Sequence, residues 1–503
     1  MERVLTAAED YNNRLAQLGR LESAGVNCYP GVPPVVTHRN QGVIDNYDSL
    51  EGQAVSVVGR VRNWRSLGKI IFAPIEDQTG VVQVVISRNG IGDDDQFKLI
   101  RDNFSRGDWI ATTGSLGKTK TGEISVFPGD VTMLNKALRA APFKVEDPEI
   151  QQRQRYLQTL VDPQARDRFR TRSQMVEMMR QHFIQKLGCL EVETPILDTI
   201  YGGASARPFT TYHNAHNTDL YLRIANELYL KKMTVGGYTE GVFEFSRDFR
   251  NEGIDATHNP EFTQVELYKP FWDYKMMMGM TEHLMSGIAE RLTGKKVINF
   301  KGQEIDLTPP WRRLTIYDGL KQKLDIDPEK IDDDQLTELA RSYGIDALTR
   351  GDRLLGIFEE VWEDDLIQPT FVMDYPIETS PLTKIHRDDP NLVERFEIFV
   401  GGMEVGNCYT ELNDPRDQIA RFEAEAAKKS QGDMEAMIAD EDFLTALELG
   451  MPPQAGIGIS IDRWLMLLAG VSNIRQAIYF PVLRPRNRIE GTATASNGTV
   501  FPS

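Results

Sequence analysis

The chain has 503 residues, which at roughly 150 residues per domain corresponds to about three units and excludes a single small module. With 57 Lys and Arg against 74 Asp and Glu, its formal net charge is −17, which excludes a uniformly basic nucleic-acid coat. A polyanionic partner must therefore meet a local basic patch. The apolar stretch at 464–471 is far shorter than the about 18 residues of a membrane span, so we expect no membrane association.

Cysteine usage and the N-terminal residues bear on the compartment. Cys28, Cys189 and Cys408 are scattered and none has CxxC spacing, so we expect neither a disulfide framework nor a zinc site. Residues 1–11 have no apolar core and no transit pattern. We therefore expect a cytoplasmic protein.

The first part of the chain changes from a helical sequence pattern to a β-strand pattern. Residues 12–24 have leucines at helical spacing and end at Gly25, which predicts an amphipathic helix. Between 54 and about 134, five short stretches alternate apolar and polar residues between turn signals. This pattern fits an OB-type barrel, which is a common oligonucleotide-binding scaffold.

The second part is longer and mixes helices with strands. A helix is predicted over 166–187, followed by a strand at 190–195, and the alternation continues to 480. We expect an α+β domain on a mostly antiparallel sheet, with a solvent-facing acidic helix within 331–348. The predicted organisation is an N-terminal helical arm (1–50), an OB-fold domain (51–140), a linker (141–165), a catalytic domain (166–486) and a polar tail (487–503).

Residues 243–268 read as strand, polar loop and strand. Strict alternation places two sets of side chains on adjacent faces: Glu244, Arg250 and Glu252 from the first strand, and Phe262, Gln264, Glu266 and Tyr268 from the second. A solvent-facing sheet could carry such polar residues without any function. A phenylalanine on a charged face, however, favours a flat stacking partner such as a purine.

Residues 394–412 predict a hairpin that turns at Gly401 and Gly402. In that register Glu404 lies opposite Phe399, so Glu397 and Glu404 are diagonal neighbours roughly 7–8 Å apart. Two such carboxylates can share Mg²⁺ with phosphate oxygens. Asn407, Tyr409 and Glu411 lie an odd number of residues after Glu404, so regular alternation places them on the opposite face of the strand. Either they belong to that other face, or the strand register shifts by one residue. We predict a bulge near Gly406.

Residues 456–467 predict a glycine-containing strand followed by a buried helix. Gly456 and Gly458 allow a ligand to approach the backbone closely. Arg463, at the beginning of the helix, suits a phosphate or a purine.

Together these segments resemble the class II aminoacyl-tRNA synthetases over residues 12–485. The helix at 166–187 with Pro195 resembles motif 1, the dimer-forming element; 249–262 resembles motif 2 and 458–463 motif 3. Three stretches (202–209, 227–231 and 406–414) are similar to those of the lysine-specific branch. The resemblance implies a homodimer that uses ATP, Mg²⁺, L-lysine and tRNA(Lys).

The resemblance also implies roles for individual residues. The catalytic residues would be Arg250, on the α-phosphate and substrate carboxylate, Glu252 and Arg463. Glu252 and His258 would contact ATP, Phe262 and Arg463 would enclose the adenine, and Glu397 and Glu404 would hold Mg²⁺. The lysine site would comprise Gly203 and Glu227 at the α-amino group and Glu266, Tyr268, Asn407, Tyr409 and Glu411 along the side chain. Asn226, where the family usually has Pro, is expected to cap the helix that begins at Glu227.

In the barrel, a basic cluster of Arg60, Arg62, Arg65 and Lys69 accompanies the aromatic residues Trp64 and Phe72. Such a surface suits single-stranded bases. The resemblance implies an anticodon-binding site that includes Arg65, Phe72 and Gln83. The alternative is that the two aromatic side chains belong to the barrel core.

Three other functions compete with lysine charging. A synthetase for aspartate or asparagine would need cationic or amide partners, whereas this pocket offers Glu266 and Glu411. A non-catalytic RNA-binding paralogue should have lost Arg250, Arg463 or the Glu397 and Glu404 pair. An enzyme that transfers the lysyl group to a protein or lipid would have no need of the barrel.

Overall fold

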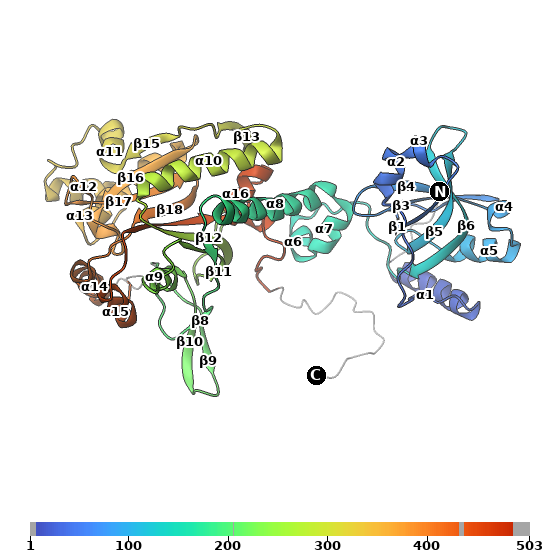
Figure 1. The fold of residues 1–503 in the computed structure, drawn as a ribbon, viewed down its shortest axis with the longest axis horizontal. Coiled ribbons are helices and arrows are strands. Elements are labelled where there is room, and N and C mark those ends of the chain that lie inside the picture. Colours follow the sequence, from blue (N-terminus) through green and yellow to red (C-terminus); the bar gives the residue numbers. More distant parts are fainter. Residues whose placement is uncertain (1–6, 205, 432–436, 486–503) are drawn as a thin grey trace. The chain divides into compact units, whose positions relative to one another are not determined.

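The computed structural model describes residues 7–204, 206–431 and 437–485 (Figure 1). The chain divides between Val145 and Glu146 into two compact units. The predicted polar tail at 487–503 lies outside the described residues.

The first unit is a β-barrel with helices around it. Its helices are α1 (Ala7–Ser23), α2 (Asn40–Asp45), α3 (Tyr47–Leu50), α4 (Arg88–Ile91) and α5 (Asp94–Asn103). Its strands are β1 (Ala54–Val61), β2 (Arg65–Leu67), β3 (Ile70–Glu76), β4 (Val81–Ser87), β5 (Trp109–Lys118) and β6 (Ile124–Asn135). They pair in the order β1-β5-β6-β4-β3-β2, and an additional β1–β3 pairing closes the sheet. The predicted OB-type barrel is confirmed.

The second unit contains an eight-stranded sheet with the order β15-β16-β17-β18-β19-β12-β11-β7. Six of these strands are β11 (Val242–Phe249), β12 (Glu261–Pro270), β16 (Thr370–Pro376), β17 (Leu392–Phe399), β18 (Glu404–Thr410) and β19 (Gln454–Ser460). The edge strand β7 (Leu190–Glu191) pairs in parallel with β11, and the edge strand β15 (Arg312–Thr315) pairs in parallel with β16. The other neighbouring strands of the sheet are antiparallel. The expected α+β architecture is confirmed, although the strand predicted at 190–195 is only two residues long.

Smaller strands and helices complete this unit. The strands β8 (Leu197–Asp198), β9 (Thr210–His213) and β10 (Thr218–Leu222) form a projecting three-stranded sheet, and β13 (Val297–Phe300) pairs with β14 (Gln303–Asp306) (Figure 1). The helices are α6 (Pro148–Arg153), α7 (Arg155–Val161), α8 (Pro163–Gln185), α9 (Glu227–Val235), α10 (Tyr274–Thr293), α11 (Ile316–Leu324), α12 (Asp333–Ser342), α13 (Arg350–Trp362), α14 (Pro415–Ser430), α15 (Glu441–Glu448) and α16 (Ile461–Ala469).

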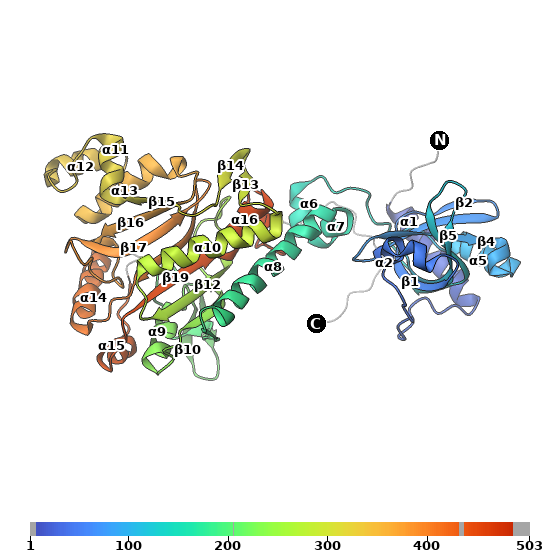
Figure 2. The same cartoon turned by 45° about the horizontal axis from the view of Figure 1, so that its top comes forward.

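Three helices cover one face of the large sheet (Figures 1 and 2). Met179 of α8, Met285 of α10 and Trp464 of α16 belong to one buried cluster with the sheet residues Phe243 and Ile457. Burial of this face leaves the opposite face of the central strands for a ligand site. The fully buried Trp464 packs on Trp311 and so belongs to the core.

The acidic helix predicted within 331–348 is α12, and its solvent-facing assignment is only partly right. Leu336 and Ala340 are buried in a cluster that also includes Leu354 and Phe358 of α13. The helix is amphipathic, because its acids lie in the first turn while apolar side chains four residues apart face its neighbour.

Candidate active site

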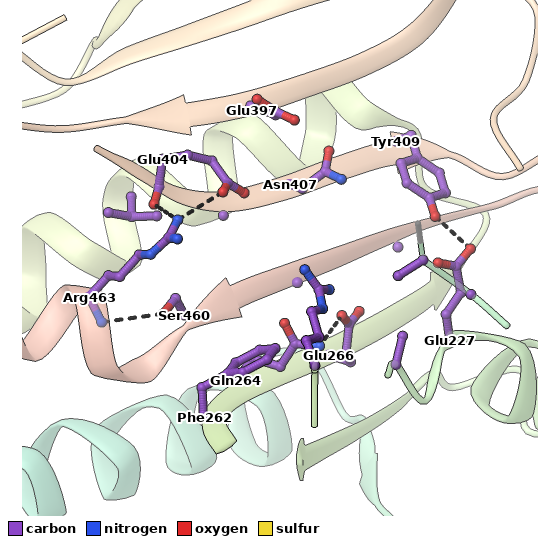
Figure 3. A pocket seen from close by; sticks show the side chains of 18 of the residues that line it. Glu227, Phe262, Gln264, Glu266, Glu397, Glu404, Asn407, Tyr409, Ser460 and Arg463 are labelled. Atoms are coloured by element: carbon purple, nitrogen blue, oxygen red, sulfur yellow. Dashed lines mark hydrogen bonds and ion pairs between the residues drawn. The ribbon is translucent and has the colours of Figure 1, made fainter. Parts of the chain in front are cut away.

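A cavity of about 400 Å³ lies over the central strands of the large sheet (Figure 3). Thirteen of the fourteen residues predicted for the cleft line it: Gly203, Glu227, Arg250, Glu252, His258, Phe262, Glu266, Tyr268, Glu397, Glu404, Asn407, Tyr409 and Arg463. They come from segments more than two hundred residues apart in sequence. The pairing of β12, β19, β18 and β17 brings most of them together.

Strand pairing places the polar residues of β12 on the cavity floor. Glu266 lies opposite Gly458, and Tyr268 lies opposite Gly456. The absence of side chains at these glycines is required, because a Cβ on Gly458 would lie 2.6 Å from Glu266 Oε1. The two glycines therefore make the space into which the floor residues extend.

The prediction for the preceding strand is wrong in one respect. The strand β11 ends at Phe249, so Arg250 and Glu252 lie in the following loop instead of on the strand face. They still line the cavity. Glu244, predicted to share their face, is buried and forms an ion pair with Arg223 at 2.9 Å.

Asn226 does not cap α9, contrary to expectation. Its Nδ2 donates instead to Glu244 Oε2 at 2.7 Å. This bond orients the amide so that its Oδ1 accepts no hydrogen bond from the helix, and Oδ1 has no partner among the described residues.

The predicted hairpin of β17 and β18 and its bulge are both confirmed. Phe399 lies opposite Glu404, and both turn glycines have φ of 68°. The register then shifts so that Gly406 lies opposite Ile398. The bulge turns the side chains of Asn407 and Tyr409 to the same face as Glu404, and both line the cavity.

One end of the cavity is rich in acids and hydroxyls. The Tyr409 hydroxyl donates to Glu227 Oε1 at 2.5 Å, and the Tyr268 hydroxyl donates to Glu266 Oε2 at 3.2 Å. Gln264 Nε2 donates to Glu266 Oε1 at 3.0 Å. Burial, together with the nearby negative charges of Glu227 and Asp248, raises the pKa of Glu266 well above its usual value. This end, called here the amine end, is prepared for a cation.

Glu411 is the predicted residue that does not line the cavity. It follows the end of β18, where its N–H donates to the carbonyl of Gln454. Its Oε2 lies 2.5 Å from Lys231 Nζ. A Cβ on Gly456 would lie 2.3 Å from its Oε1 and 2.4 Å from Tyr268 Cε1, so this oxygen lies beside Tyr268 on the cavity-facing side of β19.

At the opposite end, called here the nucleotide end, Arg463 lies near Glu404, with Phe262 on the floor strand (Figure 3). The loop between β11 and β12 also contributes lining residues to this cavity. The Arg463 guanidinium donates to Glu404 Oε2 at 2.9 Å and lies 3.0 Å from His258 Nε2. The Arg250 guanidinium lies 5.2 Å from the centre of the Phe262 ring. Ser460 begins α16, and its hydroxyl accepts from the backbone N–H of Arg463 at 3.2 Å.

Glu397 and Glu404 lie on the hairpin at the upper wall of the cavity. Arg395 Nη2 donates to Glu397 Oε1 at 2.6 Å. Burial raises the pKa of Glu397, and the charge of Arg395 opposes that rise. Within 7–204, 206–431 and 437–485, no group of three or more His, Cys, Asp or Glu is suited to a metal ion. A cation on this pair would need further oxygen ligands, as Mg²⁺ takes from phosphate and water.

In the barrel, strand register places the three predicted residues on one face. Arg65 lies opposite Phe72, and Gln83 lies opposite Pro74, two residues further along β3. Phe72 alternates with the buried Ile71 and Ala73. Trp64, by contrast, packs against the barrel core, and its indole N–H donates to the carbonyl of Arg101. The core interpretation therefore holds for Trp64.

Sequence reasoning missed two residues behind the amine end, Lys231 and Asp248. Lys231 forms an ion pair with Glu227, and Asp248 accepts a hydrogen bond from Gln264, which also donates to Glu266. The available signal was the spacing of Lys231, which lies four residues after Glu227 on a helix and so shares its face.

Comparisons with known proteins agree with this architecture. Residues 147–484 match the family model of class II tRNA synthetases (D, K and N), and residues 55–134 match that of the OB-fold nucleic acid binding domain. Among the described residues, no helix is long and apolar enough to cross a membrane.

Two curated relatives cover almost the whole chain. A lysine–tRNA ligase of Clostridium perfringens (strain ATCC 13124) is 44% identical over 485 residues, which is 94% of this chain and 96% of the relative. A lysine–tRNA ligase of Clostridium botulinum (strain Loch Maree) is 44% identical over 490 residues, 95% of this chain and 96% of the relative. The chain therefore belongs to the class II tRNA synthetases of the D, K and N group.

Proposed function

We propose that this protein is a lysine–tRNA ligase. It activates L-lysine with ATP to give lysyl-adenylate and pyrophosphate, and it transfers the lysyl group to the 3′-terminal adenosine of tRNA(Lys). The observation that carries the proposal is the polarity of one cavity, with buried acids at the amine end and Phe262 and Arg463 at the nucleotide end. The near full-length similarity to lysine–tRNA ligases supports it.

The amine end suits lysine because a buried ammonium needs carboxylate and hydroxyl partners to offset its desolvation. Gly203 and Glu227 receive the α-amino group. Glu266, Tyr268, Asn407 and Tyr409 enclose the side chain, and the buried Oε1 of Glu411 adds negative charge beside Tyr268. Aspartate would place a carboxylate against these acids, which is unfavourable, and asparagine would bring them no positive charge.

The nucleotide end suits ATP. Phe262 stacks on the adenine from one side, and Arg463 covers it from the other after releasing part of its contact with His258 or Glu404. Glu252 and His258 contact the nucleotide. Arg250 draws the lysine carboxylate and the α-phosphate together, and the carboxylate oxygen then attacks phosphorus in line with departing pyrophosphate.

Catalysis in this scheme consists of positioning and charge stabilisation, and it needs no protein nucleophile. Arg250 and Arg463 stabilise the negative charge that develops on the phosphate. Glu397 and Glu404 would hold Mg²⁺, and their two carboxylates fit a hard cation that completes its shell with phosphate and water oxygens. When bound, this ion neutralises phosphate charge.

The barrel and α8 provide the remaining contacts. Arg65, Phe72 and Gln83 form a basic and aromatic face for anticodon bases. The helix α8, in the motif 1 region, forms a homodimer interface. We place the enzyme in the cytoplasm and assign it no zinc.

The deciding experiment is amino-acid-dependent exchange of pyrophosphate into ATP, followed by charging of total tRNA. We expect lysine alone among the standard amino acids to stimulate exchange and to be esterified to tRNA(Lys). Stimulation by aspartate or asparagine would overturn the assignment. Lysine-dependent exchange without charging would favour transfer to another acceptor, and absence of exchange would favour a non-catalytic RNA-binding protein.

A further inference from the structure

We propose that Lys231 is a positioning residue of the amine end, whose buried ammonium orients Glu227 and Glu411 and sets the negative charge that lysine meets. This inference rests on the proposed function and adds an internal cation to the specificity of the same site. The residue belongs to α9 and does not itself line the cavity.

The contacts of Lys231 join the two acids that flank it. Its Nζ lies 2.5 Å from Glu411 Oε2 and also forms an ion pair with Glu227 Oε1. The side chain is 0% exposed, so solvent does not screen these contacts. The rings of Tyr409 and Phe443 lie 5.3 Å and 5.7 Å from Nζ, within the range of cation–π attraction.

The arrangement directs one oxygen of Glu411 toward the floor of the cavity. Because Lys231 occupies Oε2 of Glu411, its Oε1 turns toward Gly456 and Tyr268. Among the residues that the structure describes, this buried oxygen has no hydrogen-bond partner. A buried acceptor without a donor is costly, and an incoming ammonium relieves that cost.

Charge accounting gives Lys231 its second role. Burial raises the pKa of Glu266 and of Glu411, so the cluster is fully ionised only beside cations; Glu227, Glu266 and Glu411 then carry −3, and Lys231 reduces the total to −2. The two ammonium groups of lysine then neutralise the cluster, while Arg250 takes the substrate carboxylate. Without Lys231, three neighbouring buried carboxylates would repel one another, and protonation of one would remove a partner from the substrate.

Other charged groups near the cluster do not take over this role. Behind Glu266, Asp248 lies 3.1 Å from Arg223, which also pairs with Glu244. Arg223 is therefore already shared by two acids. On the far side of α9, Lys232 pairs with Asp440 at 3.1 Å and Asp442 at 2.7 Å, away from the cavity.

The test compares Lys231→Met with the matched control Lys232→Met by steady-state pyrophosphate exchange. For Lys231→Met we expect the KM for lysine to rise at least about tenfold, the cost of leaving buried acids unbalanced, with the KM for ATP within about twofold of wild type. Lys232→Met should leave the KM for lysine within about twofold. Equal rises for lysine and ATP, or the same rise in both variants, would overturn the proposal.

A charge-compensating pair separates positioning from packing, even if Lys231→Met alone fails to fold. Glu411→Gln leaves a net charge of −1 on the cluster, whereas Lys231→Met with Glu411→Gln restores −2. We expect the double variant to have a lower KM for lysine than Glu411→Gln alone. A double variant that binds lysine more weakly than Glu411→Gln would show that Lys231 acts only by filling space.

The same measurements distinguish this inference from the proposed function. If the wild-type protein does not activate lysine, the proposed function fails. If it does, and Lys231→Met retains the wild-type KM for lysine, only the role of Lys231 fails.

Discussion

The two ends of the cavity hold their charged groups differently. At the amine end, the side chain of Lys231 is 0% exposed, and that of its partner Glu227 is 7% exposed. At the nucleotide end, the side chain of Arg463 is 14% exposed, that of Glu404 is 38% and that of His258 is 52%. The cation of the amine end, Lys231, is therefore fully buried with its partners, whereas the cation of the nucleotide end, Arg463, has partners that are exposed to solvent.

This difference shows how one cavity can bind two ligands of opposite charge. Buried ion pairs are costly to break singly, so the amine end keeps its geometry whether or not lysine is present. Exposed pairs contribute little to stability, so Arg463 can exchange Glu404 or His258 for a purine at small cost. In the proposed function, the substrate side chain would meet a prepared site, whereas the nucleotide would displace partners of Arg463.

The largest effect is expected from Glu404→Gln, which removes the charge that pairs with Arg463 and one of the two proposed ligands of Mg²⁺. The hydrogen bond from Arg463 to the backbone carbonyl of residue 404 remains. We expect kcat for exchange to fall by about 10²–10³-fold, the scale of losing one preorganised charge-stabilising group. The Mg²⁺ concentration for half-maximal activity should rise, and the KM for lysine should stay near wild type.

The matched control is Glu360→Gln, an exposed acid on α13. It should leave both kcat and the Mg²⁺ dependence unchanged. A large rise in the KM for lysine in Glu404→Gln would show that the two ends are not independent.

The next effect is expected from Glu266→Gln at the amine end. An amide keeps the shape of the side chain but removes one charged partner of the substrate ammonium, which costs about 2–3 kcal/mol. The KM for lysine should rise by about 30–150-fold, and the KM for ATP should change by less than about threefold. Tyr268→Phe, which removes only a neutral hydroxyl, should raise the KM for lysine less; a larger rise than in Glu266→Gln would contradict the assignment of roles.

Asp248→Asn tests the residue that contacts Glu266 through the side chain of Gln264. Gln264 Nε2 donates to Asp248 Oδ2 at 2.6 Å and to Glu266 Oε1 at 3.0 Å, so Asp248 helps orient the amide. Burial raises the pKa of Asp248 from 3.8 to about 6, although Arg223 and Ser246 oppose the rise. Because the folded pKa is higher than the unfolded value, the stabilising contribution is present below about pH 4 and is lost as pH rises through about 6.

The asparagine variant has no such titration. The free energy of unfolding of Asp248→Asn relative to wild type should therefore increase by about 2 kcal/mol between pH 4 and pH 7. Denaturant unfolding at both pH values measures this difference. A difference that is constant with pH would mean that Asp248 does not titrate in this range.

The alternation of side chains along a β-strand predicted much of the floor of the cavity from sequence. The parity of Phe262, Glu266 and Tyr268 follows from strand alternation, and the conflict between Glu404 and Asn407 required a bulge where Gly406 allows one. These features depend on local backbone geometry, which a single segment of sequence contains.

Features set by tertiary contacts were not predictable in this way. Lys231 is a charged helical residue, and only the packing of α9 against the end of β18 makes it a buried counter-ion. Trp64 could have faced either side of the barrel, because an aromatic side chain suits a core as well as a base. Glu252 was misplaced because alternation does not reveal where a strand ends.

The smallest effect is expected from Phe72→Ala in the barrel, and neither end of the cavity should respond to it. Loss of one stacked base costs about 1–3 kcal/mol, so the KM for tRNA(Lys) should rise by about tenfold. Lysine-dependent exchange, which needs no tRNA, should retain the wild-type KM for both lysine and ATP. Val32→Ala, which shortens an exposed apolar side chain outside the barrel strands, is the control and should leave charging unchanged. If Phe72→Ala impaired exchange as well, its effect would come from the folding of the whole chain. That result would contradict the proposal that this barrel face binds bases.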